Sequence, residues 1–544
     1  MLKTFKQDGN YSVNKIYLIV ISLCTLLPGF GAIDNNPIRW MSIGFATIFF
    51  LFFANFISQK KINFKNSTIV ILSGVYLFFN CLTSDNINES LITLYKLIII
   101  ASVFYACYLA IKKISDPFLF ICLILIGSLL FESIYTVIDF ITLKDSFTGI
   151  SQNRNISSSS LVFKLIFLIF LIDHSKSFNK KLILKVLEII TLFSIILLQS
   201  RLGILSVLII YFLYFILIKS SRKKMVFPIL ISCLFFLYFD NNDFQNKVEK
   251  EYTFENLSGD DSTNQRLSFY TSALSLFSGK PIIGNGLGSW KYKSINNSSK
   301  SNSVLVPYYT HNDFLQILME SGLIGLVIYL TFFGKLFKNI IENREKKIFI
   351  PLTIALIIFT INSLINFPIH RTQEYIPFII CCAYILSKKN FEAEGKKSNI
   401  LPILIVLLIP SIVISNYEYQ SLKFQGVLMD DYKNNKFSMS LNEVKKINYK
   451  IPNLSSNVVP ISTYLSRYYF NEGNYYESIR LLDYSLEINK LDLMTNELML
   501  RNYIFTNQSN QALILVKDLL KKYPENKNYS NILLAILKDL DSKN

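Results

Sequence analysis

The chain of 544 residues is 51% hydrophobic and only 17% charged, and its mean hydropathy is positive (+0.37). A composition this apolar excludes a single soluble globular protein and indicates a membrane protein. The formal net charge of +17 lies mostly in short loops between apolar runs, so it indicates membrane topology and gives no support to nucleic-acid binding. The seven cysteines fall within the apolar runs, where they are expected as small buried side chains.

Apolar runs recur from the N-terminus to residue 416, and most are long enough to cross a hydrocarbon core of about 30 Å. We place them near 16–33, 39–57, 68–83, 91–111, 117–142, 160–172, 182–200, 203–218, 225–239, 312–333, 348–367, 374–386 and 399–416. The sequence therefore predicts an all-α, polytopic membrane domain over residues 1–416, with about 12 or 13 transmembrane helices.

The loops between these runs alternate in charge. The basic ones are the N-terminal arm, 60–65, 112–115, 176–181, 219–224, 335–347 and 388–397. Because basic loops stay on the cytoplasmic side of a membrane, the acidic or Asn/Ser-rich loops 83–90, 143–159 and 240–311 are expected on the other side. The longest of them, 240–311, is predicted to be a large periplasmic loop.

Residues 417–544 contain no apolar run long enough to span a membrane, so we expect a separate soluble helical domain there. Similar residues recur at an offset of 34 positions: Tyr469/Tyr503, Ser478/Ala512, Leu482/Val516, Ser485/Leu519 and Lys490/Pro524. This spacing resembles the tetratricopeptide repeat, in which small residues let paired helices pack closely. An odd number of spans would place this domain on the same outer side as 240–311.

Polar residues at the outer ends of the spans are candidates for chemistry, because a site there can receive both a lipid-linked donor and an acceptor. Arg201 begins a span, Arg266 lies on an expected amphipathic surface helix, and His311 immediately precedes a span. Taken singly, Arg201 would snorkel to lipid headgroups, Arg266 would be solvated and His311 would be structural. Their combination favours one shared site.

Four segments between residues 145 and 370 resemble, in order, the signature of the O-antigen ligase superfamily, which includes bacterial O-oligosaccharyltransferases and related polymerases. They are "GISQNRN" at 149–155, "QSRLG" at 199–203, Arg266 with "PIIGNG" at 281–286, and "HNDFLQILMESGLIG" at 311–325. The resemblance implies a GT-C-like fold. It also implies transfer of a glycan from an undecaprenyl-diphosphate carrier at the periplasmic face of the bacterial inner membrane.

By this resemblance the catalytic residues are His311, Arg201 and Arg266. The arginines are expected to stabilise the charge that grows on the departing lipid diphosphate through bidentate contacts, with no metal and no cofactor. His311 would accept or orient the proton of the acceptor hydroxyl, since imidazole is well matched to proton transfer near neutral pH. Asn312 would hold the geometry of its neighbour and contribute to substrate binding.

Three further residues are candidates for binding the lipid-linked substrate. Lys96 and Lys164 fall inside expected spans near the outer surface, where they could widen a basic cradle. The competing interpretation is a structural ion pair with a glutamate in the same membrane region. Gln152 lies in the Asn-rich outer loop. The aspartates of 239–243 and 259–261 are expected to be solvated loop residues, so no metal site is predicted.

Gly322 and Gly325 lie three residues apart in the span that follows His311. In a continuous helix they share one face, which would let a second helix approach closely beneath the histidine.

The acceptor stays open among a lipid A core sugar, a protein hydroxyl and a growing polymer, and the last would make the protein a polysaccharide polymerase of the same superfamily. The repeat domain favours a protein acceptor or partner, because such solenoids hold peptides in a groove. A polysaccharide transporter or flippase is the alternative from another class. It would not need the His-Asn and Gly-x-x-Gly signature, and the two halves of the chain show no internal duplication.

Overall fold

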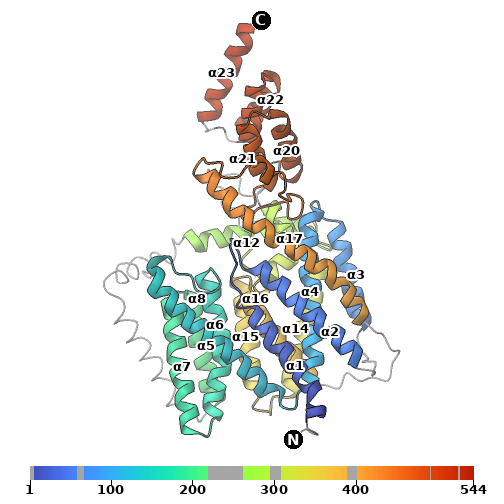
Figure 1. The fold of residues 1–544 in the computed structure, drawn as a ribbon, viewed down its shortest axis with the longest axis vertical. Coiled ribbons are helices and arrows are strands. Elements are labelled where there is room, and N and C mark those ends of the chain that lie inside the picture. Colours follow the sequence, from blue (N-terminus) through green and yellow to red (C-terminus); the bar gives the residue numbers. More distant parts are fainter. Residues whose placement is uncertain are drawn as a thin grey trace.

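The computed structural model describes residues 5–57, 67–218, 261–294, 308–388, 401–490, 492–522, 524 and 527–543. Regular secondary structure in these residues is entirely helical, apart from one isolated bridge between Leu454 and Pro460. Figure 1 shows a bundle of long helices with a column of shorter C-terminal helices standing on one end. The expectation of an all-α polytopic membrane protein with an appended helical region is confirmed.

Each expected span within the described residues coincides with a helix of the bundle. These helices are α1 (Phe5–Cys24), α2 (Asn36–Ile57), α3 (Ser67–Leu82), α4 (Ile87–Lys112), α5 (Pro117–Leu143), α6 (Arg154–His174), α7 (Phe178–Leu197), α8 (Arg201–Leu217), α14 (Asp313–Glu342), α15 (Phe349–Ile365), α16 (Thr372–Ser387) and α17 (Leu401–Lys433). The span expected at 225–239 lies outside the described residues.

Six helices of the described chain are long and apolar enough to cross a membrane by length and composition. They are α4, α5, α6, α14, α17 and the first 19 residues of α2, and shorter apolar segments lie in α1, α3, α8 and α15. The multi-pass character is therefore confirmed, while the total of 12 or 13 spans stays a prediction.

The centre of the bundle is formed by α6 and α16. Nearly every side chain of both helices is buried, whereas the outer helices expose large apolar residues such as Phe49, Leu72 and Ile183. An apolar periphery suits contact with lipid, because no polar group on it needs a hydrogen-bond partner. The polar residues of α6 and α16 consequently face other protein groups, and these groups matter for the site.

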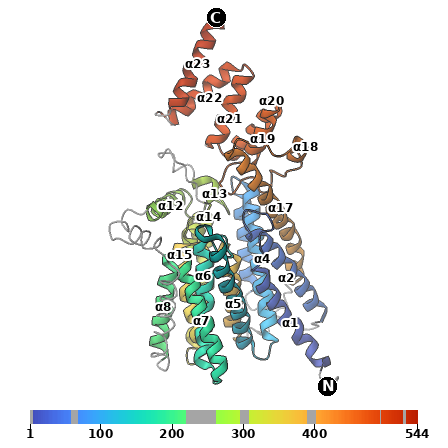
Figure 2. The same cartoon turned by 60° about the vertical axis from the view of Figure 1, so that its left-hand side comes forward.

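One end of the bundle carries most of the short elements, and we call it the site end. There α12 (Asp261–Gly279) lies across the bundle axis, as both views show (Figures 1 and 2), and α13 (Trp290–Lys293) and the 3-10 turn η4 (Pro368–His370) lie nearby. A helix is thus present around Arg266, while its position at the membrane surface stays a prediction. A second 3-10 turn, η1 (Lys144–Ser146), follows α5.

The expected packing role of Gly322 and Gly325 is wrong, because α14 is broken at Gly322 (φ 61°, ψ −167°). The segment 281–288 enters this break: the N–H of Leu323 donates to the carbonyl of Pro281, and the N–H of Gly286 donates to the carbonyl of Glu320. α3 reaches this part of α14, where Tyr76 and Asn80 donate to the carbonyls of Ser321 and Glu320, but the atoms nearest to the two glycines belong to the segment 281–288 and to α14 itself. Glycine is needed because a Cβ on Gly322 would lie 2.3 Å from the carbonyl oxygen of Ile282.

The C-terminal region begins with α17, which runs unbroken through the expected domain boundary at residue 416. It is followed by α18 (Leu441–Val444), α19 (Ile461–Asn471), α20 (Tyr475–Ile488), α21 (Leu493–Phe505), α22 (Ser509–Lys522) and α23 (Lys527–Lys543). Ser478 and Ala512, which match at the 34-residue offset, are both completely buried. The tetratricopeptide assignment and the division of the chain at 416 remain predictions.

Candidate active site

His311 occupies a constrained position directly before α14. Its backbone is in the left-handed region (φ 56°), which is uncommon for a residue with a Cβ. Asn312, the next residue, caps α14 by accepting the N–H of Leu315 at 3.0 Å, and the hydroxyl of Thr310 donates to the Asn312 carbonyl at 2.7 Å. The hydroxyl of Tyr270 donates to the His311 carbonyl at 3.0 Å. The turn therefore fixes the direction in which the imidazole ring points.

The imidazole of His311 lies between two aromatic rings. Its centroid is 6.2 Å from that of Phe269 and 4.9 Å from that of Phe367. Nδ1 is buried and has no hydrogen-bond partner among the described residues. Burial, followed by the positive charges of Arg266 and Arg371, lowers the pKa of His311 to about 4. The ring is thus neutral at physiological pH and has a nitrogen available for a proton.

Arg266 reaches this histidine from α12. Phe269, Tyr270 and Ala273 follow it at helical spacing, so all four residues share the face of α12 that packs on α14. Ala273 and Phe269 lie in one apolar cluster with Trp290 and Met319. The structure therefore brings two of the expected catalytic residues, Arg266 and His311, into the same electrostatic neighbourhood.

Arg371 is a second cation beside His311, and the sequence analysis missed it. Its Nη1 donates to both carboxylate oxygens of Asp34, at 3.1 and 2.9 Å, and its guanidinium lies over the rings of Phe367 (5.2 Å) and Tyr309 (5.7 Å). Although burial opposes the charged state of each group, the pair lowers the pKa of Asp34 and raises that of Arg371. A signal was present, since Arg371 is basic within a segment expected on the outer side, against the charge trend of the loops.

Arg201 and Gln152 belong to elements other than those that carry His311, Arg266 and Arg371. Arg201 begins α8, and Gln152 lies in the turn before α6. The N-cap of α8, Ser200, accepts the N–H of Gly203. α8 packs against α6 and α15. Gln152 is exposed in a turn with φ 57°, and this turn is anchored because Ser151 donates to the side chain of Gln373 at 2.7 Å. A role for Arg201 and Gln152 in substrate contact stays a prediction.

Lys96 and Lys164 both form ion pairs with glutamates. Lys164 is 1% exposed and its Nζ lies 2.5 Å from Glu132, deep between α5 and α6. Lys96 is 15% exposed and pairs at 2.8 Å with Glu418 of α17. These contacts of Lys164 agree with the interpretation that it forms a structural ion pair with a glutamate. Lys96, by contrast, also lines a cavity at the site end, so contact with a substrate remains open for it.

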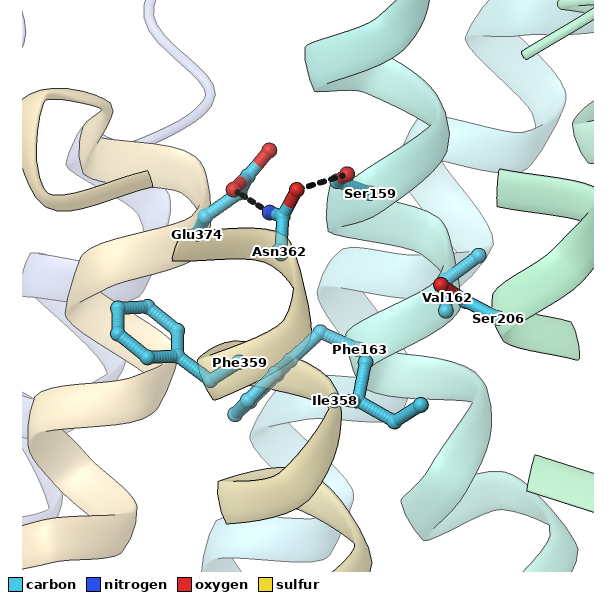
Figure 3. A pocket seen from close by; sticks show the side chains of 8 residues that line it. All are labelled: Ser159, Val162, Phe163, Ser206, Ile358, Phe359, Asn362 and Glu374. Atoms are coloured by element: carbon cyan, nitrogen blue, oxygen red, sulfur yellow. Dashed lines mark hydrogen bonds between the residues drawn. The ribbon is translucent and has the colours of Figure 1, made fainter. Parts of the chain in front are cut away.

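A small cavity lies between α6, α8, α15 and α16. Figure 3 shows that Asn362 bridges two helices across its polar end, donating to Glu374 at 2.7 Å and accepting from Ser159 at 3.3 Å, while Phe163, Ile358 and Phe359 line the apolar part. Asn362 of α15 thus links a polar residue of α6 to one of α16. This network holds the start of α16, and with it Arg371, in a fixed place.

The fold and the cluster of Arg266, Arg371 and His311 define a multi-pass membrane protein that places cations and a neutral histidine at the end of its helix bundle. Residues 186–330, about a quarter of the chain, match the family model described as O-antigen ligase. The matched region contains Arg201, Arg266, His311 and Asn312. Three of the four segments on which the motif resemblance rests lie in this region, and the segment 149–155 precedes it.

Two curated proteins share shorter stretches with the chain, and both bear the name "Putative polysaccharide ligase". The one from Rickettsia felis is 41% identical over 66 residues, which are 11% of this chain and 16% of the relative. The one from Rickettsia conorii is 37% identical over 81 residues, which are 14% of this chain and 20% of the relative. The alignments thus span a fifth or less of each relative's length. Together these matches support the assignment of the chain to the O-antigen ligase superfamily.

Proposed function

We propose that this protein transfers a glycan from an undecaprenyl-diphosphate carrier to an acceptor hydroxyl at the periplasmic face of the bacterial inner membrane. The single observation that carries the proposal is the position of His311, a neutral histidine held beside Arg266 and Arg371 within the region that matches the O-antigen ligase family model. A cluster of cations suits a lipid diphosphate, and a neutral imidazole suits a hydroxyl that must lose a proton.

The reaction would proceed by displacement at the anomeric carbon. The acceptor oxygen forms the new bond to this carbon, the bond between the carbon and the phosphate oxygen breaks, and the lipid diphosphate leaves with the electron pair. The acceptor proton passes to His311. Arg201 and Arg266 would contact the diphosphate, where two or three charge-assisted hydrogen bonds stabilise the developing charge. Arg371, fixed by Asp34, would add positive potential.

The low pKa of His311 fits this sequence of events. In the free protein burial, and after it the charges of the nearby arginines, disfavour the protonated ring and lower the pKa of His311. A bound diphosphate would neutralise part of that positive charge, and the pKa of His311 would rise toward its ordinary value. The donor would therefore strengthen the base at the moment when an acceptor hydroxyl needs it.

The test is transfer by the purified protein in nanodiscs, with a defined undecaprenyl-diphosphate oligosaccharide and three acceptors: a lipid A core, a Ser/Thr-containing peptide and a second lipid-linked oligosaccharide. Product with the first or second acceptor supports ligase or protein oligosaccharyltransferase activity. Product with the third alone supports the polymerase alternative. Movement of the intact donor across the bilayer without transfer would instead identify the transporter class.

A gene deletion makes the same distinction in the cell. Glycan blotting and mass spectrometry then report whether lipopolysaccharide, glycoprotein or polymer length changes. Absence of change in all three would contradict the proposal.

A further inference from the structure

A second polar cavity lies at the site end, on the other side of Tyr309 from His311. It is partly open to solvent, and the space between its walls, the open part included, is about 480 Å³. It lies between α2, α4, α14 and η4, and its lining includes Trp40, Lys96, Lys291, Tyr309, Gln316 and His370. The ring of Tyr309 stacks on His370 (4.5 Å) and on Phe367 (4.4 Å), and Phe367 also contacts His311. One aromatic layer therefore separates this cavity from the candidate base.

The polar groups of the cavity are mainly hydrogen-bond donors. Trp40 is 1% exposed, and its indole N–H is buried with no hydrogen-bond partner among the described residues. A buried donor without a partner is costly, so an unmatched one beside a cavity points to a group that is absent here. Lys96 and Lys291 each carry three N–H groups, and one from each is used by a glutamate.

The glutamates that pair with these lysines do not line the cavity. Glu89 is fully engaged: one carboxylate oxygen accepts the Nζ of Lys291 at 2.9 Å, and the other accepts the backbone N–H groups of Asn453 and Leu454 at 3.1 and 3.2 Å. Glu418 holds Lys96 from the side of α17. The cavity wall thus presents ammonium and N–H groups, while the balancing carboxylates stand behind it.

The electrostatic state of His370 agrees with this arrangement. Burial, followed by the charges of Lys96, Lys291 and Arg371, lowers the pKa of this histidine well below its ordinary value. Several cations therefore act on one point of the cavity. The rest of the lining is mainly apolar: the aliphatic side chains of Leu97, Ile100 and Ile369 lie there beside the flat rings of Trp40 and Tyr309.

We propose that this cavity is a second substrate subsite, which binds an oxyanion, a carboxylate or a phosphate, through Trp40, Lys96 and Lys291. The oxyanion has two possible sources within the proposed function: an acidic sugar of the glycan, or the diphosphate of the carrier. Which of the two sources applies rests on the proposed function of glycan transfer. The existence of the subsite is independent of that function, because it is tested by binding alone.

The experiment uses the full-length protein in nanodiscs of phosphatidylcholine, so that no anionic lipid competes. Binding of glucuronate, pyrophosphate and uncharged glucose is measured by saturation-transfer NMR and calorimetry. We expect saturable binding of glucuronate or pyrophosphate and none of glucose. Glucuronate alone identifies an acidic sugar as the source, whereas pyrophosphate alone identifies the carrier. Binding of neither, or equal binding of glucose, overturns the proposal.

The chain offers a matched control for the indole. Its two tryptophans, Trp40 and Trp290, are both buried, and only Trp40 lines the cavity. Trp40→Phe should weaken binding of the oxyanion at least about tenfold, because a hydrogen bond to a charged group is lost, and Trp290→Phe should leave it unchanged. Lys96→Gln should also weaken binding, in contrast to Lys280→Gln on the exposed turn after α12. Equal effects of the two tryptophan variants would contradict the assignment.

A second measurement, made on the wild-type protein, tests the proposal even if the Trp40 variant does not fold. The chain has three histidines, His174, His311 and His370, so selective labelling gives three imidazole signals, which single His→Gln variants assign. The oxyanion should raise the pKa of His370 in the wild-type protein and leave that of His174 unchanged. An unchanged His370 at saturating probe would overturn the proposal.

Discussion

The imidazole of His311 and the guanidinium of Arg371 contact the same ring, that of Phe367, at 4.9 and 5.2 Å. The two residues are sixty positions apart, and they meet because α14 begins and α15 ends at the same end of the bundle. A cation placed this close to an imidazole disfavours its protonation. The acid–base behaviour of the candidate site is therefore set by tertiary structure.

Replacement of His311 by asparagine separates chemistry from backbone geometry. Asparagine tolerates a positive φ better than most residues, so the turn before α14 should survive, while the proton acceptor is lost. We expect turnover per correctly inserted molecule to fall by about 10²–10⁴-fold, with normal expression and thermal stability. Donor binding should persist. If His311→Asn lowered stability while the surviving molecules turned over normally, the histidine would be structural.

Lysine variants test whether the arginines act through their planar fork. Arg201→Lys and Arg266→Lys keep the charge and lose the bidentate geometry, so each should reduce transfer at least about tenfold in protein that remains inserted. Alanine variants should reduce it further. Near-normal activity of both lysine variants would leave only a general electrostatic role, and active alanine variants would remove the diphosphate assignment. The exposed Arg344 of the loop after α14 provides a control.

The pH dependence of the reaction should show the effect of the neighbouring cations on the pKa of His311. Since the pKa of the free protein's histidine is lowered to about 4, kcat/KM should stay high as the pH falls through 6 and decline only near the lowered pKa. Arg266→Gln removes a positive charge, which raises the pKa of His311 and moves the acid limb of kcat/KM to higher pH. NMR titration of the labelled imidazole checks the shift directly. If the acid limb of kcat/KM did not move in the Arg266→Gln variant, Arg266 would not lie close to His311 in solution.

Of two glycines near the same turn, only one should be sensitive to replacement by alanine. At Gly284 (φ 75°) an added Cβ would lie 2.4 Å from the carbonyl oxygen of Glu320 and the nitrogen of Gly322, whereas at Gly279 nothing lies within 4 Å. Gly284→Ala should displace the segment that enters the break in α14 and cost about 3 kcal/mol or more of stability. Gly279→Ala should be nearly neutral. Thermal unfolding of the two variants in detergent gives the comparison, and equal melting temperatures would argue against the interlock.

Reporter fusions test the orientation that the proposed function requires. From the basic loops, fusions after residue 224 or 345 should report a cytoplasmic location, and fusions near 295 or after 430 should report a periplasmic one. A cytoplasmic signal after 430 would mean that the number of spans is even. The C-terminal helices would then lie on the side opposite the proposed chemistry.

The hydropathy of the sequence was sufficient to predict the helices of the bundle but not the contacts of the candidate site. The apolar runs gave the positions of the described bundle helices because burial in lipid or protein demands long apolar segments. The pairing of Arg371 with Asp34 joins residues that are 337 positions apart, so only the fold reveals it. The break at Gly322 could not be predicted either, since the distortion depends on the segment 281–288 from elsewhere in the chain.

His311, Arg266 and Asn312 could be proposed as site residues from the sequence because a motif fixes their order. Lys164 shows the opposite case: its charge inside a span suggested a substrate contact as readily as an ion pair, and only the position of Glu132 on the neighbouring helix distinguishes the two. Lone charges in apolar segments are expensive in both interpretations. Their partners are set by helix packing, which a single sequence does not report.

The continuity of α17 fixes the rotation of everything beyond it. This helix of 33 residues is about 50 Å long, and each residue advances it by about 100° of turn. A single inserted or deleted residue between Glu418 and Lys433 would therefore swing the following helices by more than a quarter of a revolution, and Asn453 would no longer meet Glu89 and Asn86, which it contacts now. The C-terminal helices can accordingly be exchanged between related proteins only in steps that preserve helical phase, such as seven residues.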